Sequence, residues 1–299
     1  MVGPTASGKS AVALEVARRL GDVELVSVDS MGVYRGMDVG TAKPTESERA
    51  EVPVHLLDLA EPHEDFSVAR FAAAAADALA GIEARGQRAL LVGGTGLYLQ
   101  AVVDGLALPG EWPDVRARLE EEAAAPAGVG ALHRRLAATD PPAAARIEPG
   151  NRRRIVRALE VSLGSGQPFS SYGPGLGAYP PTRFRLAGLW LPRQVVGARI
   201  EARYRRQLDA GFLEEVRALG SAARGMSRTA RQALGYRELL DHLAGRTTLD
   251  EAVDLAVRRT REFARRQRAW FRRDPRIVWF GAAANPVAVL PALLGHWAG

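Results

Sequence analysis

One eight-residue segment near the start of the chain constrains its fold more than any other feature. It fits the pattern G-x-x-x-x-G-K-[S/T] of a phosphate-binding loop and consists of Gly3, Pro4, Thr5, Ala6, Ser7, Gly8, Lys9 and Ser10. Apolar residues at helical spacing follow from Val12 to Leu20, so we expect the loop to open a helix. Backbone N–H groups and the helix N-terminus would then face an anion. The alternative is a chance match in a glycine-rich chain, and the helical pattern directly after the loop argues against it.

The lysine of this loop stands out against the rest of the sequence. The chain has 40 Lys and Arg residues, and only Lys9 and Lys43 are lysines. A lysine kept at position 9, in a chain that otherwise uses arginine, indicates a place where a compact ammonium is needed and a planar guanidinium is too large.

The composition excludes several kinds of site. The 299 residues, of which 47% are hydrophobic, can form one large α/β domain and a smaller one. There is no cysteine, which excludes disulfides, thiolate metal sites and a cysteine nucleophile. The five histidines lack metal-ligand spacing, and we expect structural roles for them. No apolar run approaches the ~20 residues that span a bilayer, and no signal peptide is evident, so we expect a cytoplasmic protein without membrane contact.

The start of the chain departs from the usual pattern. Only Met1 and Val2 precede the loop, whereas a phosphate-binding loop normally follows a buried strand of several apolar residues. We expect the true start to lie upstream of Met1, so that the first strand is truncated here. The alternative is a sheet that has lost its central strand and folds poorly.

Strands and helices alternate in the first third of the chain. Residues 23–28 and 89–92 are predicted strands, and residues 66–80 a helix between them. This alternation predicts an α/β fold with a P-loop NTPase-like parallel sheet and flanking helices. Ligands bind at the carboxyl ends of such strands. Ser10, Asp29 and Thr95 all lie at or just past expected strand ends, so one crevice could collect them.

We predict three regions along the chain. Residues 1–110 form the first part of the P-loop core, 111–150 an inserted alanine-rich helical module, and 151–299 the remainder of the core with basic helices. A long loop is expected at 164–181. The later predicted elements are a helix at 151–163, a strand at 185–191, helices at 194–210, 212–219, 229–243 and 249–273, and a strand at 277–280.

The distribution of charge points to a polyanionic partner. The formal net charge is +6, and arginines concentrate at 152–157, 193–206 and 258–276. A stripe at helical spacing consists of Arg258, Arg261, Arg265, Arg268 and Arg272. Few acids lie nearby, so we predict unpaired arginines that follow a phosphate backbone, with Phe263 and Trp270 anchoring another side of the helix. An ordinary solvated face is the alternative.

The residues alone leave the role of Asp29 open. Nucleotide-hydrolysing enzymes usually have an acidic residue at the end of an apolar strand, whereas the strand at 89–92 ends in Gly-Gly-Thr-Gly. Asp29, at the end of the other strand, could hold magnesium, cap a helix or accept a proton. An ordinary strand-end carboxylate is the alternative.

Five blocks of the sequence together resemble the bacterial tRNA dimethylallyltransferase family in order and spacing. They are the loop at 3–10, Ser-Val-Asp-Ser-Met at 27–31, the stretch 34–44 that contains Lys43, Leu-Val-Gly-Gly-Thr-Gly-Leu-Tyr at 91–98, and Gln-Ala-Leu-Gly-Tyr-Arg at 232–237. The resemblance runs from residue 2 to about residue 280. It implies transfer of a dimethylallyl group from its diphosphate to N6 of the adenosine 3′ of the anticodon in tRNA.

The resemblance also implies roles for the site residues. Backbone amides of residues 5–10, the Lys9 ammonium and Mg2+ on the Ser10 hydroxyl would stabilise the departing diphosphate. Arg237 would supply a second cation, with a surface arginine as the alternative. Asp29 would orient the adenine amine and take its proton, and Thr95 would contact the reacting nucleotide or the diphosphate.

The implied partners are dimethylallyl diphosphate and the tRNA anticodon stem-loop, which the insert at 111–150 would grip. The implied tRNA contacts are Asp29, Ser30, Met31, Gly32, Thr95, Arg116, Arg153, Arg154, Ile155, Val156, Arg157, Gln232, Ala233, Leu234, Gly235, Tyr236 and Arg237. The adenosine would be extruded from its single-stranded loop into a channel. Gly32 departs from the family pattern, which often has glutamine there, so a base contact is lost or supplied by a neighbour. We expect a monomer.

Three other functions fit parts of the sequence. A P-loop small-metabolite kinase would use the loop for ATP and would not need the arginine stripe. A prenyltransferase acting on free adenine nucleotides, like the plant cytokinin-forming relatives, would not need the basic insert. A non-catalytic RNA-binding protein would not need an intact Gly8-Lys9-Ser10 together with Asp29.

Overall fold

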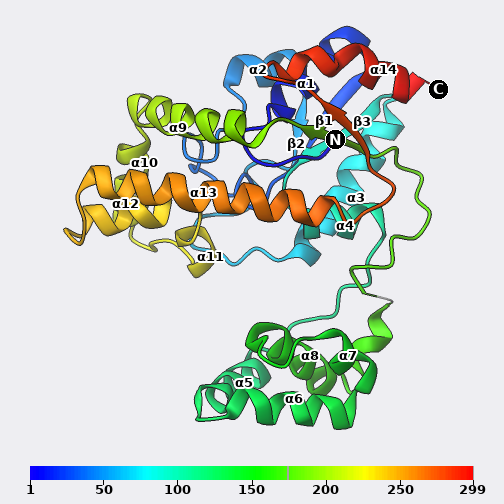
Figure 1. The fold of residues 1–299 in the computed structure, drawn as a ribbon, viewed down its shortest axis with the longest axis vertical. Coiled ribbons are helices and arrows are strands. Elements are labelled where there is room, and N and C mark those ends of the chain that lie inside the picture. Colours follow the sequence, from blue (N-terminus) through cyan, green and yellow to red (C-terminus); the bar gives the residue numbers. More distant parts are fainter. Residues whose placement is uncertain (174, 299) are drawn as a thin grey trace. The chain divides into compact units, whose positions relative to one another are not determined.

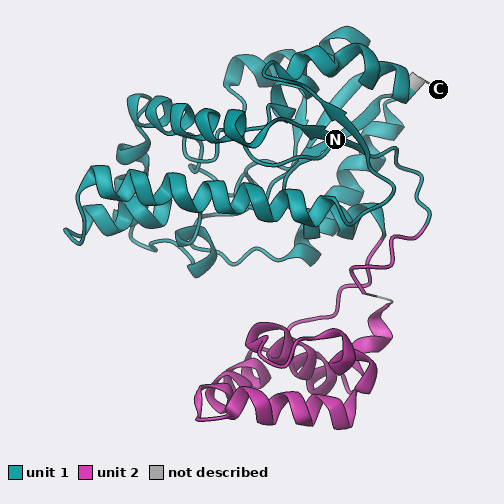
Figure 2. Ribbon diagram, viewed as in Figure 1, with its two compact units in different colours: residues 1–104, 181–299 teal, residues 105–180 magenta. Residues whose placement is uncertain are grey.

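The computed structural model describes residues 1–173 and 175–298, which form two compact units (Figures 1 and 2). Unit 1 comprises Met1–Asp104 and the chain from Pro181 onward, and unit 2 comprises Gly105–Pro180. The predicted insertion at 111–150 was therefore drawn too narrowly, because residues 151–180 belong with the inserted helices and not with the core.

The strands of unit 1 form parallel ladders. They are β1 (Val23–Val28), β2 (Val54–His55), β3 (Arg88–Gly93), β4 (Ala187–Trp190) and β5 (Val278–Gly281). They pair in the orders β2-β1-β3 and β4-β5. Val2 joins the two ladders through parallel bridges to Gly93 and Gly188. The α/β class with a parallel sheet is thus confirmed.

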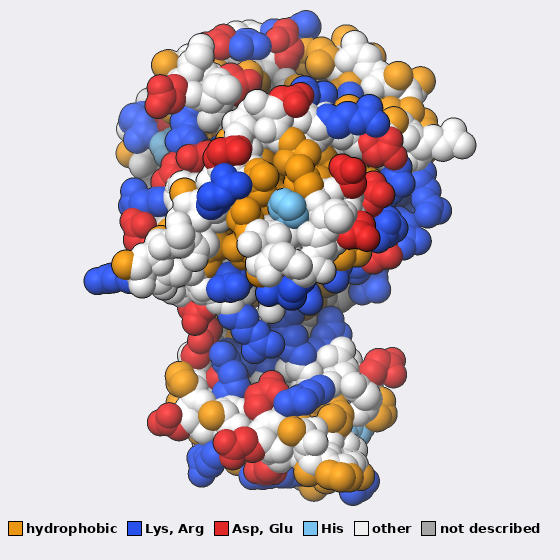
Figure 3. Space-filling model, turned by 90° about the vertical axis from the view of Figure 1, so that its left-hand side faces the viewer, with side chains coloured by type: hydrophobic (Ala, Val, Ile, Leu, Met, Phe, Trp, Pro, Cys, Tyr) orange, Lys and Arg blue, Asp and Glu red, His pale blue; other side chains and the backbone are white. Residues whose placement is uncertain are grey.

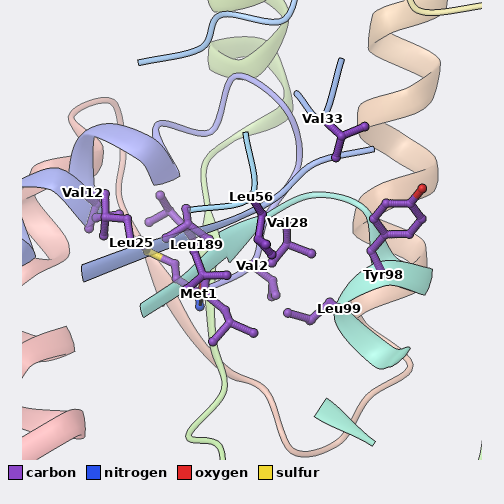
Figure 4. Close-up of a cluster of buried hydrophobic side chains, with 14 of the residues drawn as sticks. Met1, Val2, Val12, Leu25, Val28, Val33, Leu56, Tyr98, Leu99 and Leu189 are labelled. Atoms are coloured by element: carbon purple, nitrogen blue, oxygen red, sulfur yellow. Dashed lines mark hydrogen bonds between the residues drawn. The ribbon is translucent and has the colours of Figure 1, made fainter. Parts of the chain in front are cut away.

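Met1 and Val2 lie in the centre of this arrangement. Val2 donates its N–H to the Ala187 carbonyl oxygen at 2.8 Å and accepts the N–H of Leu189 at 2.8 Å. Its side chain is 1% exposed, within the apolar cluster of Figure 4. The N-terminal amine donates to the Leu91 carbonyl oxygen at 2.6 Å, and burial lowers its pKa to about 5. Two residues therefore supply the hydrogen bonds that connect the ladders.

Helices cover the sheet of unit 1 on both faces (Figure 1). The helices of unit 1 are α1 (Lys9–Leu20), α2 (Glu46–Glu51), α3 (Val68–Ala84), α4 (Gly96–Val103), α9 (Arg193–Asp209), α10 (Phe212–Ser221), α11 (Arg228–Arg231), α12 (Tyr236–Leu243), α13 (Leu249–Phe271), α14 (Leu290–Ala298) and the 3-10 helix η2 (Pro286–Val289). In α3, Phe71, Ala75 and Leu79 are buried at four-residue spacing, which explains why its alanine-rich sequence forms a core helix. No helix in the described part of the chain is long and apolar enough to cross a membrane.

The predicted helix at 229–243 is two helices in the structure. The break between α11 and α12 falls at Gly235, which has a φ of 88°. A Cβ at this position would lie 2.8 Å from the Phe212 ring, so the close approach and the positive φ both require glycine.

Unit 2 is a small helical body with its own core. Its helices are α5 (Pro113–Ala124), α6 (Gly128–Thr139), α7 (Pro141–Arg146) and α8 (Arg152–Ser165), followed by the 3-10 helix η1 (Phe169–Tyr172). Leu119, Leu132, Leu136 and Leu159 are among the side chains that fill the core. Because α8 supplies part of this core, the helix belongs to unit 2 and not to unit 1, which contains the sheet.

Candidate active site

The phosphate-binding loop connects Val2 to α1, as predicted. Gly8 has a φ of 88°, and a Cβ there would overlap the ring of Pro286, so only glycine fits. The Lys9 ammonium donates to the Pro4 carbonyl oxygen at 3.3 Å, which folds the side chain back along the loop. The Ser7 hydroxyl is fully buried and has no hydrogen-bond partner among the described residues. The loop therefore retains unused polar groups next to a helix N-terminus.

Three side chains from α9 and α13 hold this loop, and none of them was identified from the sequence. Arg203 donates to the Thr5 hydroxyl at 3.2 Å, and Arg199 donates to the Ala6 carbonyl oxygen at 2.9 Å. Gln267 accepts the Thr5 N–H at 2.7 Å. The expectation that the amides of residues 5–10 all face the anion is therefore wrong for Thr5 and Ser7, because the Thr5 N–H donates to Gln267 and the Ser7 N–H donates to the Pro4 carbonyl oxygen.

Burial disfavours the charged forms of two cations at the site, Lys9 and Arg203. Burial lowers the pKa of Lys9 to about 8; the Asp29 charge acts in the opposite direction, and the Arg203 charge adds to the lowering. Burial also lowers the pKa of Arg203, against raising contributions from Tyr204 and Asp29. Neither Lys9 nor Arg203 forms an ion pair in the described part of the chain. Two cations held close together in this way favour a multiply charged anion.

Asp29 and Thr95 meet at the carboxyl ends of β1 and β3, as expected. Val28 pairs with Gly93 at the end of the parallel ladder, and a Cβ at Gly93 would overlap the Val28 carbonyl group. The Thr95 hydroxyl accepts the N–H of Ser30 at 3.1 Å. The first glycine of the Gly-Gly-Thr-Gly turn is thus explained by the close approach of the two strands.

The carboxylate of Asp29 is oriented by its own loop. Its Oδ1 accepts the N–H of Met31 at 2.8 Å and, more weakly, the N–H of Gly32 at 3.3 Å. Its Oδ2 makes no hydrogen bond to the residues that the structure describes. One oxygen therefore fixes the group while the other can accept a hydrogen bond from a ligand.

The donor set does not form a metal site by itself. The described residues contain no group of three or more His, Asp or Glu side chains that could hold an ion. Ser10 is exposed in the first turn of α1, and Asp29 is half-buried. Magnesium commonly binds through one or two protein oxygens together with substrate phosphates and water. The residues therefore fit a magnesium ion that binds together with a phosphate group.

Gln267 also links the two halves of the site. Besides accepting the Thr5 N–H, it donates through Nε2 to the Gly94 carbonyl oxygen at 2.9 Å. A Cβ at Gly94 would overlap this amide, which explains the second glycine of the turn. The Gln267 side chain is 7% exposed, so its two hydrogen bonds fix the loop relative to the end of β3.

Only part of the block at 232–237, for which the resemblance implied tRNA contacts, is exposed at the surface. Tyr236 is fully buried, and Ala233 and Gly235 are buried as well, so these three side chains are not exposed for tRNA contact. Gln232 and Arg237 are exposed, and Leu234 is half-buried. The Arg237 side chain has no partner among the described residues, and the guanidinium groups that contact the loop come from α9.

The predicted tRNA contacts of unit 2 also divide into two kinds. Ile155 and Val156 are 0% and 2% exposed and belong to the core, because they lie on the inner face of α8. Arg153 and Arg154 are exposed. Arg116 and Arg157 bind the buried carboxylate of Glu160, at 2.9 Å and 2.8 Å. The side chains of Ile155 and Val156 are therefore not exposed for tRNA contact, and two of the arginines bind a carboxylate within unit 2.

The arginine stripe of α13 is partly paired, contrary to the prediction. Arg261 forms an ion pair with Glu201, Arg265 lies 3.9 Å from Glu262, and Arg268 stacks over Trp190 at 5.4 Å. Arg258 and Arg272 are exposed. Acidic and basic side chains alternate over one face of unit 1 in Figure 3. The predicted anchor Phe263 is only half-buried, and Phe271 instead lies on the buried face of α13.

Comparison with known proteins identifies one family. Residues 32–274 match the family model described as IPP transferase. A tRNA dimethylallyltransferase of Geobacter metallireducens is 47% identical over 99% of this chain and 96% of its own length. One from Kineococcus radiotolerans is 51% identical over 94% and 90%, respectively. Among solved structures, the full-length tRNA isopentenylpyrophosphate transferase of Bacillus halodurans has a TM-score of 0.72 and 38% identity, and the match covers 100% of this chain and 94% of that one.

These matches cover nearly the whole chain, include its five signature blocks and agree with the P-loop-like site between β1, β3 and α1. They do not favour a small-metabolite kinase. The chain belongs to the IPP transferase family, that of the bacterial tRNA dimethylallyltransferases.

Proposed function

We propose that this protein transfers the dimethylallyl group from dimethylallyl diphosphate to N6 of the adenosine 3′ of the anticodon in tRNA, with release of diphosphate. Family membership supports this reaction. The observation that carries it is the placement of Lys9 and Arg203, two cations without a carboxylate partner among the described residues, at a phosphate-binding loop near Asp29.

The leaving group is the part of the substrate that needs most stabilisation. As the bond between the allylic carbon and the diphosphate oxygen breaks, negative charge grows on that oxygen. The Lys9 ammonium, the Arg203 guanidinium and the N-terminus of α1 all present positive potential to the loop. The Ser10 hydroxyl would hold a magnesium ion, which would supply further positive charge at the leaving group.

Asp29 acts on the other reactant. The N6 amine of adenine is a weak nucleophile because its lone pair is delocalised into the ring. Oδ2 of Asp29 can accept a hydrogen bond from this amine while Met31 and Gly32 hold Oδ1. The new bond joins N6 to the allylic carbon, and the N6 proton passes to the carboxylate, a role worth ~10²–10⁴-fold in rate. Thr95 contributes by fixing the Ser30 backbone beside Asp29.

The proposed partner is the tRNA anticodon stem-loop, in the cytoplasm, with the protein acting as a monomer. Exposed arginines on both units support binding to a phosphate backbone. They are Arg153 and Arg154 on α8, and Arg258 and Arg272 on α13. Contacts of this kind give an affinity that falls with rising salt concentration.

Product analysis tests the reaction directly. Unmodified tRNA is incubated with the protein, magnesium and dimethylallyl diphosphate, digested to nucleosides and examined by mass spectrometry. We expect one adenosine per tRNA to gain a dimethylallyl group, in step with diphosphate release. In a parallel incubation, ATP replaces dimethylallyl diphosphate. Phosphoryl transfer from ATP without any prenylated adenosine would contradict the proposal and favour the kinase.

A further inference from the structure

Glu215, on α10, binds a backbone segment of the site in an unusual way. Its Oε2 accepts the N–H groups of Asp38 at 2.9 Å and Val39 at 2.7 Å. Its Oε1 accepts the N–H of Gly40 at 3.1 Å and the Tyr236 hydroxyl at 2.6 Å. All four donors are neutral, and Glu215 has no ion pair with a cation in the described part of the chain.

The same segment is held from its carbonyl side by α9. The Gly40 carbonyl oxygen accepts from Arg203 at 3.2 Å and from Gln207 at 2.9 Å. A Cβ at Gly40 would overlap the Phe212 ring, so the segment is packed as well as hydrogen-bonded. Segment 38–40 therefore lies between the carboxylate of Glu215 and the guanidinium of Arg203.

Arg203 extends from this segment to the phosphate-binding loop. One of its terminal nitrogens donates to the Gly40 carbonyl oxygen, and the other donates to the Thr5 hydroxyl at 3.2 Å. Each acceptor is a neutral oxygen. We propose that Glu215 is a positioning residue, which fixes segment 38–40 so that Arg203 is held at the loop with its charge available to the diphosphate. This inference rests on the proposed function.

A direct ion pair would not serve this purpose. A carboxylate that binds a guanidinium on two parallel hydrogen bonds occupies its donors and offsets its charge. Unit 2 contains such a pair, in which Arg116 contacts both oxygens of Glu160 at 2.9 Å and 3.0 Å. In the active site, the peptide groups of segment 38–40 separate Glu215 from Arg203. The carboxylate thus orders the backbone, and the guanidinium keeps its charge for a ligand.

The variant Glu215→Gln tests the inference, with Glu214→Gln as the matched control. Glu214 is the preceding residue and is exposed, with only a 3.8 Å contact to Arg217. An amide can replace only some of the four hydrogen bonds, because its NH₂ group cannot accept from an N–H. We expect Glu215→Gln to raise the KM for dimethylallyl diphosphate and the Kd for inorganic diphosphate by about tenfold, a typical effect of losing hydrogen bonds to a charged group. The value of kcat should change less, and Glu214→Gln should match the unaltered protein.

A double-mutant cycle distinguishes positioning from general stabilisation of the fold. In an Arg203→Met background, Glu215→Gln should change the Kd for diphosphate by less than about twofold, because its effect acts through Arg203. An undiminished effect in that background would overturn the inference. The inference would also be overturned if the Glu215→Gln variant bound diphosphate as tightly as the Glu214→Gln variant.

A milder variant keeps the test decisive if Glu215→Gln does not fold. Tyr236→Phe removes one donor to Glu215 and leaves the ring in place. It should raise the Kd for diphosphate less than Glu215→Gln and only when Arg203 is present, whereas an unchanged Kd counts against the inference. If the unaltered protein neither binds diphosphate nor prenylates tRNA, the proposed function itself fails. If it does both and the variants have no effect, only the role of Glu215 is wrong.

Discussion

The titration of Lys9 leads to a quantitative prediction about diphosphate binding. Burial lowers the pKa of its ammonium from the ordinary 10.5 to about 8. The protonated form attracts the anion, and it predominates in the free protein only below about pH 8. Above this pH, binding requires uptake of a proton, so the affinity for diphosphate must fall as the pH rises.

The size of the effect follows from the pKa. Lys9 is almost fully protonated at pH 7 and about one-tenth protonated at pH 9, so the affinity should fall about tenfold between these values. The loss continues until the pH reaches the pKa of Lys9 in the complex, which the bound anion raises. Proton uptake on binding should be close to zero at pH 7, about one-half at pH 8 and close to one at pH 9.

Isothermal calorimetry with dimethylallyl diphosphate in the absence of tRNA measures both quantities. Titrations at fixed magnesium and ionic strength, in two buffers with different ionisation enthalpies, give the Kd and the proton uptake. The terminal phosphate of the ester titrates near ~6, below the range of interest. Lys9→Met should bind more weakly and lose the pH-dependent step. A Kd that stays constant from pH 7 to 9 in the unaltered protein, without proton uptake, would refute the reasoning.

Three substitutions test other parts of the structure. Asp29→Ala should reduce turnover ~10²–10⁴-fold, while tRNA binding by gel shift changes little; unimpaired turnover would remove Asp29 from the mechanism. Gly40→Ala should lower the free energy of unfolding by about 1–3 kcal/mol, because its Cβ would overlap the Phe212 ring; denaturant unfolding measures this loss. Glu160→Ala should destabilise the protein by about 1.5–3 kcal/mol, because it removes the charged acceptor of the hydrogen bonds from Arg116 and the Trp112 N–H; thermal unfolding that matches the unaltered protein would contradict this.

The parts of the site that lie close to a local motif could be predicted from the sequence. The loop pattern and the helix after it identified Gly8 and Lys9. Asp29 and Thr95 followed from two apolar strands, because residues just past the ends of neighbouring parallel strands must lie close together. The register between β1 and β3 places Val28 opposite Gly93, and this pairing brings the two residues together.

The groups contributed by α9, α10 and α13 could not be identified in this way. Arg203 and Gln267 both contact Thr5, which lies 198 and 262 positions away in the sequence, so no local residue spacing predicts either contact. In a chain with 38 arginines among its 40 Lys and Arg residues, the arginines that serve the site look like those on the surface. A regular spacing did exist, since Arg199 and Arg203 are one helical turn apart on α9.

Resemblance to a family also does not separate contact residues from structural ones within a shared sequence block. Tyr236 lies in a signature block, yet its ring is buried against Phe212 and its hydroxyl binds Glu215. The boundary at residue 150 was wrong for a related reason. The helical pattern of α8 predicts a helix but does not show which core its apolar face enters.

The electrostatics of the site connect binding to chemistry. A pKa near 8 for Lys9 means that keeping its ammonium charged at neutral pH costs the folded protein roughly 3 kcal/mol relative to an exposed lysine. An anion at the loop relieves this cost. The departing diphosphate carries one more negative charge than the ester from which it forms. The departing diphosphate therefore relieves more of the cost of charging Lys9 than the bound substrate does. Interactions that are stronger in the transition state than in the ground state are the ones that accelerate a reaction. In the proposed reaction, Lys9 and Arg203, left without carboxylate partners in the described structure, would therefore favour breaking of the carbon–oxygen bond over mere retention of the substrate.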